Sequence, residues 1–187
     1  MNPRFSSRLL KWMGWKVQGG PIPVAKCIIL GAPHTSVWDF VVSVLFYNAI
    51  GGQAAVMVKK EFFIWPLGGL LKRLGAIPVD RSKGVSLVKQ VVEAFNTREH
   101  LQIAIAPEGT RKPTEKWKGG FHTIAKAACV PVYFGYFDWG KKEVGVAEAL
   151  PLSDNQQADI KQVRQWYKDK GVVGKHPKNF ITGTDLD

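Results

Sequence analysis

A histidine and an aspartate with four residues between them mark the part of this chain best suited to acid–base chemistry. His34 and Asp39 stand where an apolar, strand-like run, Cys27 to Leu30, gives way to a helix-like run, Val37 to Ile50. A histidine placed just ahead of a helix can present one ring nitrogen to a cleft. A carboxylate in the first helical turn can hold the other ring nitrogen and fix the tautomer. Such a pair is sufficient for a general base, with His34 as the base and Asp39 as the residue that orients it.

The same residues also fit a purely structural pattern. Ser36 is followed three residues later by Asp39, which is typical of a helix N-cap with an acid in the first turn. On this interpretation Asp39 stabilises the helix and His34 is a loop residue. The sequence leaves both interpretations open.

Two further blocks end predicted strands in an arginine. One reads G-A-I-P-V-D-R and ends at Arg81, and the other reads A-P-E-G-T-R and ends at Arg111. The planar, permanently charged guanidinium suits bidentate capture of a phosphate, and a neighbouring glycine lets the backbone approach the anion. Taken singly, each block also fits a simpler description, a solvated Asp80–Arg81 pair and an ordinary Glu108–Gly109 turn.

The elements that must position these residues follow from the hydrophobic pattern. From Ala25 onward, short β-branched runs alternate with longer helical ones, which predicts a single α/β domain with a largely parallel mixed sheet flanked by helices. The predicted strands are Cys27–Leu30, Ala54–Val58, Ala76–Val79, Leu101–Ala106, Val132–Tyr136 and Glu143–Ala147. The predicted helices are Val37–Ile50, Pro66–Leu74, Val85–Thr97, Gly120–Ala128 and Asp159–Lys170. Because ligands on such sheets bind beyond the carboxyl ends of strands, we expect His34 and residues 107–111 at one edge.

Two apolar segments have alternative interpretations. Residues 1–20 form a predicted amphipathic helix that precedes the main domain, residues 21–187. Its apolar side chains alternate with basic ones: Phe5, Leu9, Leu10, Trp12, Met13 and Trp15 with Arg4, Arg8, Lys11 and Lys16. Such a helix either lies in a membrane interface or packs on the domain. The run Phe62–Leu71 is either core or the lining of a groove for a long hydrocarbon chain.

Length, charge and cysteine content narrow the class of protein. The 187 residues suffice for one domain with a proper core, and 26 Lys and Arg against 15 Asp and Glu give a net charge of +11. This excess favours an anionic partner, such as nucleic acid, an acidic membrane surface or a phosphorylated substrate. Cys27 and Cys129 are predicted to be buried thiols in a reducing compartment. No secretory signal and no apolar run long enough to span a bilayer is seen, so we expect a cytoplasmic protein.

Taken together, the ordered blocks H-x4-D, G-x-I-P-V-D-R, P-E-G-T-R and V-P-V resemble the glycerolipid acyltransferases of the 1-acylglycerol-3-phosphate acyltransferase family. The resemblance extends from Cys27 to Tyr136. It implies an enzyme of phospholipid biosynthesis, peripheral or monotopic on the inner face of the cell membrane. Such an enzyme moves a fatty acyl group from acyl-CoA or acyl carrier protein to the hydroxyl of a lysophospholipid such as 1-acylglycerol-3-phosphate. It implies no metal and no cofactor beyond the acyl donor itself.

The resemblance also implies roles for particular residues. His34 and Asp39 become the catalytic pair, with His34 taking the proton of the attacking alcohol. The acceptor phosphate would be bound by Arg81, Glu108, Gly109, Thr110 and Arg111. The chain departs from the usual pattern at Pro33, where the family has asparagine, and at Phe134, where it has a second proline. Trp38 is bulkier than the residue in many relatives.

Two other classes of function are alternatives to this one. An acyl-thioester or ester hydrolase would need a nucleophile elbow, but the nearest match, Gly84–Val88, lacks the second glycine of G-x-S-x-G. A nucleic-acid-binding module fits the charge and the seven tryptophans, but the basic residues are scattered and no binding motif is present. The four histidines show no metal-ligand spacing, and neither a P-loop nor G-x-G-x-x-G occurs.

Overall fold

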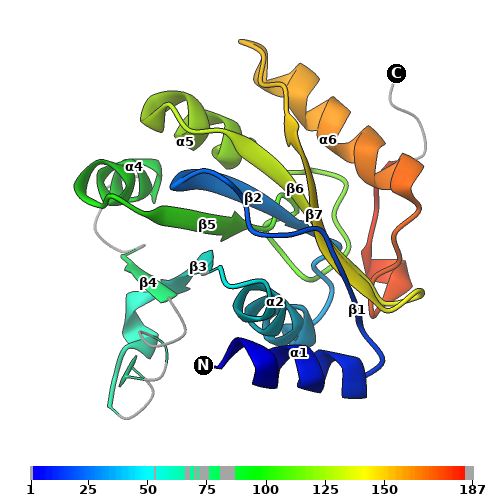
Figure 1. The fold of residues 1–187 in the computed structure, drawn as a ribbon. Coiled ribbons are helices and arrows are strands. Elements are labelled where there is room, and N and C mark those ends of the chain that lie inside the picture. The colour runs from blue at the N-terminus through cyan, green and yellow to red at the C-terminus, as the bar shows by residue number, and fades with distance from the viewer. Residues whose placement is uncertain are drawn as a thin grey trace.

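The chain folds around a seven-stranded sheet with helices on both faces (Figure 1). The computed structural model describes residues 2–52, 54–65, 68–69, 71, 76–80 and 87–183. Across the sheet the strand order is β1-β7-β6-β2-β5-β3-β4. Its strands are β1 (Lys16–Gln18), β2 (Lys26–Ala32), β3 (Ala54–Lys59), β4 (Ala76–Val79), β5 (Leu101–Ile105), β6 (Val132–Asp138) and β7 (Glu143–Leu150). All neighbouring strands pair in parallel except β6 and β7, which are antiparallel. The predicted fold class is therefore confirmed.

The helices divide between the two faces (Figure 1). Those described are α1 (Pro3–Trp12), α2 (Val37–Ala49), α4 (Leu87–Thr97), α5 (Gly120–Ala128) and α6 (Gln156–Lys170), with short 3-10 turns at Lys60–Phe62 and Pro177–Asn179. Helices α1 and α2 pack on one face, whereas α4, α5 and α6 cover the other. The central strand β2 supplies both cores, because its side chains point alternately to the two faces. Ile28 and Leu30 join the core under α4, α5 and α6, while Cys27 and Ile29 join the core under α1 and α2.

The connections that follow β2 and β5 run to opposite faces of the sheet. These strands pair in parallel, with Leu30 opposite Ile105, so their carboxyl ends lie side by side. After β2 the chain crosses to α2 on one face, and after β5 it crosses to α5 on the opposite face. Open α/β sheets bind their ligands at such a reversal, outside the carboxyl ends of the strands.

Several details differ from the sequence predictions. The prediction of a buried Cys129 is wrong: the residue is exposed at the C-cap of α5, where its backbone has a φ of 51° in the left-handed region. Cys27 is buried as predicted, and burial raises the pKa of its thiol to about 12. The segment Lys16–Gln18, predicted as part of the first helix, is an edge strand on β7. Most of the predicted helix Pro66–Leu74 lies outside the described residues.

Candidate active site

His34 lies in the short loop between β2 and α2, close to the carboxylate of Asp39. Its Nδ1 is 3.5 Å from Asp39 Oδ2, and its side chain is 29% exposed, whereas that of Asp39 is 1% exposed. This separation is longer than an ordinary hydrogen bond and short enough for an ion pair once the ring is protonated. Catalytic contacts are often long in free enzymes and shorten when substrate binds. With Nδ1 facing the acid, Nε2 is the ring nitrogen left to face a substrate.

Asp39 also caps helix α2, so the structural interpretation of this residue is confirmed. Its Oδ2 accepts hydrogen bonds from the backbone N–H groups of Thr35 at 2.8 Å and Ser36 at 2.7 Å. The Ser36 hydroxyl accepts in turn from the N–H of Trp38, which completes a capping box. The bonds that begin the helix therefore also fix the carboxylate beside the imidazole.

Glu108 joins the loop after β5 to the loop that carries His34. Both of its carboxyl oxygens lie 3.0 Å from the His34 backbone nitrogen, and the residue is 3% exposed. Burial raises its pKa to about 8, opposed by the N–H bond from His34 and assisted by the charge of Asp39. At neutral pH Glu108 is therefore mostly protonated. The contact confirms that His34 and residues 107–111 meet at one edge of the sheet.

The remaining residues of the E-G-T-R block lie nearer the solvent. Gly109 has a φ of +68°, a conformation that favours glycine. Thr110 accepts a hydrogen bond from the Lys112 N–H at 3.1 Å, and Arg111 is exposed. Arg81 lies outside the described residues. Strand β4, which precedes it, ends at the same edge of the sheet because it runs parallel to β3 and β5.

The last part of the chain covers this edge, which the sequence did not predict. The C-terminal segment, residues 172–182, donates from the His176 N–H to Thr35 Oγ1 at 3.2 Å and from Asn179 Nδ2 to the Arg111 carbonyl at 3.1 Å. It thereby touches both candidate loops. Trp139, directly after β6, donates from its indole Nε1 to Asp39 Oδ1 at 2.7 Å. The sequence could have placed Trp139 at this edge, because β6 was predicted and its carboxyl end lies beside that of β2.

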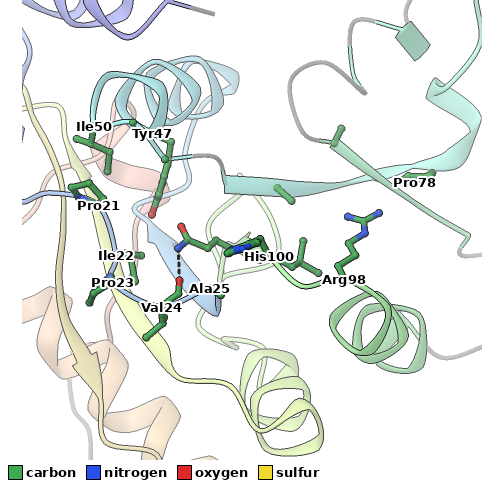
Figure 2. Close-up of a pocket in the computed structure, with 16 residues that line it drawn as sticks. Pro21, Ile22, Pro23, Val24, Ala25, Tyr47, Ile50, Pro78, Arg98 and His100 are labelled. Carbon is green, nitrogen blue, oxygen red and sulfur yellow. Dashed lines mark hydrogen bonds between the residues drawn. The ribbon is translucent and has the colours of Figure 1, made fainter.

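A cavity of about 770 Å³ lies at the opposite edge of the sheet, among the amino ends of the strands. Figure 2 shows Tyr47, Arg98 and His100 around it. The Gln102 amide, which also lines the cavity, donates to the Val24 carbonyl at 2.8 Å. None of the candidate catalytic or phosphate-binding residues that the structure describes lines this cavity. The cavity is therefore separate from the loops that carry His34 and Glu108.

Within residues 2–183, apart from the undescribed positions, no group of three or more histidine, cysteine, aspartate or glutamate side chains is placed to hold a metal ion. None of the helices in the described part of the chain has the length and apolar content needed to cross a bilayer.

Comparison with known proteins agrees with this geometry. The model of the acyltransferase family matches residues 15–135, a span that contains both loops of the site. The chain therefore belongs to the acyltransferase family.

Among solved structures, the chain is similar to the 1-acyl-sn-glycerophosphate (LPA) acyltransferase PlsC from Thermotoga maritima. The two share 16% sequence identity and align with a TM-score of 0.60 over 90% of this chain and 78% of that chain. They therefore share a fold. A search of curated proteins found no significant match.

Proposed function

We propose that this acyltransferase moves a fatty acyl group from an acyl thioester, acyl-CoA or acyl carrier protein, to the hydroxyl of a lysophospholipid such as 1-acylglycerol-3-phosphate. The observation that supports this most directly is the partly exposed His34 ring, which has Asp39 behind it and is tied through its backbone to the E-G-T-R loop. A general base and an anion-binding loop then lie at the same edge of the sheet. This is the arrangement that a phosphorylated alcohol requires.

In the proposed reaction His34 Nε2 takes the hydroxyl proton as the oxygen attacks the thioester carbonyl. The new C–O bond forms, the C–S bond breaks, and the imidazolium returns the proton to the departing thiolate. General-base assistance of this kind contributes roughly 10²- to 10⁴-fold in rate. Asp39 stabilises the imidazolium, and the leaving thiol needs little help because thiols ionise near pH ~8.5. No enzyme-bound acyl intermediate is required.

The acceptor phosphate is assigned to the cationic side of this edge. Arg111 is exposed and follows a turn whose glycine leaves the backbone open to an anion. Arg81, Gly109 and Thr110 are proposed to share this role. For Glu108 we propose a different part: a buried, mostly protonated carboxyl that holds the His34 loop does not face a phosphate.

A membrane surface is the proposed location of the acceptor. Helix α1 runs antiparallel to α2. The Ser6 hydroxyl, in α1, donates to Asn48 near the end of α2. Trp15, just after α1, packs on Trp139, and Trp139 bonds Asp39 at the start of α2. The end of α1 therefore lies beside the catalytic loop. Exposed apolar side chains gather at this end, namely Trp12 at 84%, Val37 at 60% and Trp38 at 50% exposed. Together with the net charge of +11, they suit peripheral binding to the anionic inner face of the cell membrane.

The test is an acyl-transfer assay on the full chain with acyl-CoA or acyl carrier protein and a panel of lysophospholipids. Thiol release with and without acceptor separates transfer from hydrolysis, and mass spectrometry identifies the lipid product. We expect His34→Ala and Asp39→Asn to abolish transfer in folded protein, whereas His100→Ala, at the far edge of the sheet, retains it. Near-wild-type turnover by folded His34→Ala would refute the assignment of the base. If no acceptor changes the rate of thiol release, the protein would be a hydrolase and not a transferase.

Two further variants examine the phosphate and the membrane. Arg111→Ala should raise the KM for the phosphorylated acceptor at least ~10-fold with a smaller change in kcat, whereas Arg98→Ala, at the far edge, should leave both unchanged. Trp12→Ala should weaken binding to anionic vesicles while the circular dichroism spectrum stays that of the wild type, because this side chain is 84% exposed. Unchanged flotation with anionic vesicles would argue against α1 as the membrane-facing helix.

A further inference from the structure

Trp139 reaches the candidate catalytic acid from the far side of its carboxylate. Its indole Nε1 lies 2.7 Å from Asp39 Oδ1, although the two residues are 100 positions apart in the chain. Asp39 is fully buried, so this bond is shielded from water. A hydrogen bond from a neutral donor to a buried carboxylate is charge-assisted and stronger than one between neutral groups.

The two oxygens of Asp39 have different partners. Oδ2 accepts the N–H groups of Thr35 and Ser36 and faces His34 Nδ1. Among the described residues, the hydrogen bond that Oδ1 accepts comes from Trp139. A carboxylate bonded at both oxygens cannot rotate about its Cβ–Cγ bond without losing a bond. Trp139 therefore fixes the plane in which Oδ2 meets the imidazole.

The indole of Trp139 is itself held in place and polarised. Its backbone N–H donates to the Val173 carbonyl of the C-terminal segment at 2.8 Å, and its ring packs edge-on against Trp15 at 4.9 Å between centroids. The ammonium groups of Lys142 and Lys175 lie 4.6 and 4.8 Å from its ring centroid. A cation near an indole ring is attracted to its π electrons and draws charge from the ring. The N–H then becomes a stronger donor to Asp39.

We propose that Trp139 is a positioning residue for the His34–Asp39 pair: its indole N–H holds Asp39 Oδ1 so that Oδ2 stays directed at His34. The inference rests on the proposed function of that pair. Trp139 and the C-terminal segment lie outside residues 15–135, the span that the family model matches. This part of the site is therefore supplied by the portion of the chain beyond the family match.

The charges around His34 determine what the loss of this bond does. Asp39 of α2 faces the His34 ring, and Glu108 after β5 accepts from the His34 backbone N–H. Lys142 and Lys175 lie against the Trp139 ring, which bonds Asp39. Without the indole N–H, the charge on Asp39 is less satisfied and attracts the imidazolium more strongly. The His34 ring is then less firmly aligned.

The test compares Trp139→Phe with the matched variant Trp15→Phe. Both substitutions shorten an indole to a phenyl ring in the same aromatic pair, beside the same Lys142. In the described part of the structure, however, the buried N–H of Trp15 has no hydrogen-bond partner, so its removal costs no bond. We expect Trp139→Phe to lower kcat about 10- to 100-fold with KM within about twofold, since small misalignments of a catalytic group have effects of this size. Trp15→Phe should stay within about threefold of wild-type kcat.

A second readout does not depend on activity. In otherwise wild-type protein, Asp39→Asn should shift the Trp139 indole N–H resonance upfield and leave that of Trp15 in place. The Asp39→Asn variant tests the bond to Trp139 even if Trp139→Phe does not fold. Equal kcat in the two phenylalanine variants, or an unmoved Trp139 resonance in Asp39→Asn, would overturn the inference. A wild type that transfers no acyl group would refute the proposed function, while the NMR result would still decide the role of Trp139.

Discussion

Replacing Glu108 by glutamine should change how the stability of the protein depends on pH. The carboxyl is 3% exposed, and burial raises its pKa from 4.5 to about 8. Glutamine has the shape of a protonated glutamate and keeps an oxygen that can accept the His34 N–H, but it cannot ionise. Glu108→Gln should therefore fold, and it should retain transfer activity below pH ~8.

The sign and size of the effect follow from proton linkage. Glu108 binds its proton more tightly in the folded chain than in the unfolded chain. Its contribution to stability is therefore fully present below pH 4.5 and is lost as the pH rises through about 8. At about 1.36 kcal/mol for each pH unit between the two pKa values, the loss amounts to roughly 4–5 kcal/mol. That is a large part of the stability of a typical domain.

Urea denaturation of the wild type and the variant at several values between pH 5 and pH 9 provides the measurement. We expect the free energy of unfolding of the wild type to fall by several kcal/mol relative to Glu108→Gln across this range. Glu115→Gln is the matched control, because that residue is exposed on the same loop and its substitution should leave the wild-type profile unchanged. Parallel profiles for wild type and Glu108→Gln would show that the carboxyl is ionised at neutral pH, and the assignment of Glu108 as a protonated anchor would be wrong.

Three other substitutions test the framework around the site. Tyr167→Phe removes a fully buried hydroxyl that lies 3.1 Å from the Leu30 carbonyl and 2.7 Å from the Gly135 carbonyl, so the free energy of unfolding should drop by about 1–2 kcal/mol. Gly109→Ala places a Cβ at a φ of +68° and 2.9 Å from Lys118 Cγ, and we expect a loss of about 1 kcal/mol in the same measurement. His122→Ala deprives the buried Asp159 of an imidazole at 3.3 Å and should cost about 1–3 kcal/mol, visible as a lower urea midpoint. An unchanged midpoint in any of the three would contradict the contact concerned.

Most of the fold could be predicted because the composition of the central strands identifies them as strands. A strand covered on both faces is apolar throughout, as Cys27–Leu30 is, and such runs are easy to separate from helices of amphipathic period. The errors in the predicted elements lie where polar residues determine the type or the start of an element. Strand β1 is short, exposed and rich in polar side chains, so nothing distinguished it from a helix end. Helix α6 begins three residues before the prediction because Asn155 accepts from two backbone N–H groups and starts the helix in a polar stretch.

The candidate site was predictable only as far as strand order allowed. The loops after β2 and β5 were expected at one edge, and the bond from His34 to Glu108 confirms that they meet. The protonation state of Glu108 was not predictable from the sequence. Its pKa is raised by burial, and the residue is buried only when both loops pack together. Trp139 and the C-terminal segment were missed for a similar reason. Strand order places Trp139 at this edge, but its bond to Asp39 joins residues 100 positions apart. The bond from His176 to Thr35 joins residues 141 positions apart, and no local pattern predicts such pairs.

The path of the C-terminal segment has a consequence for biosynthesis. His176 and Asn179 bond the two candidate loops, and Val173 anchors the residue that holds Asp39. A ribosome-bound chain would thus expose the whole nucleus of the sheet before these last bonds could form. These bonds to the candidate loops can form only after translation has passed Asn179.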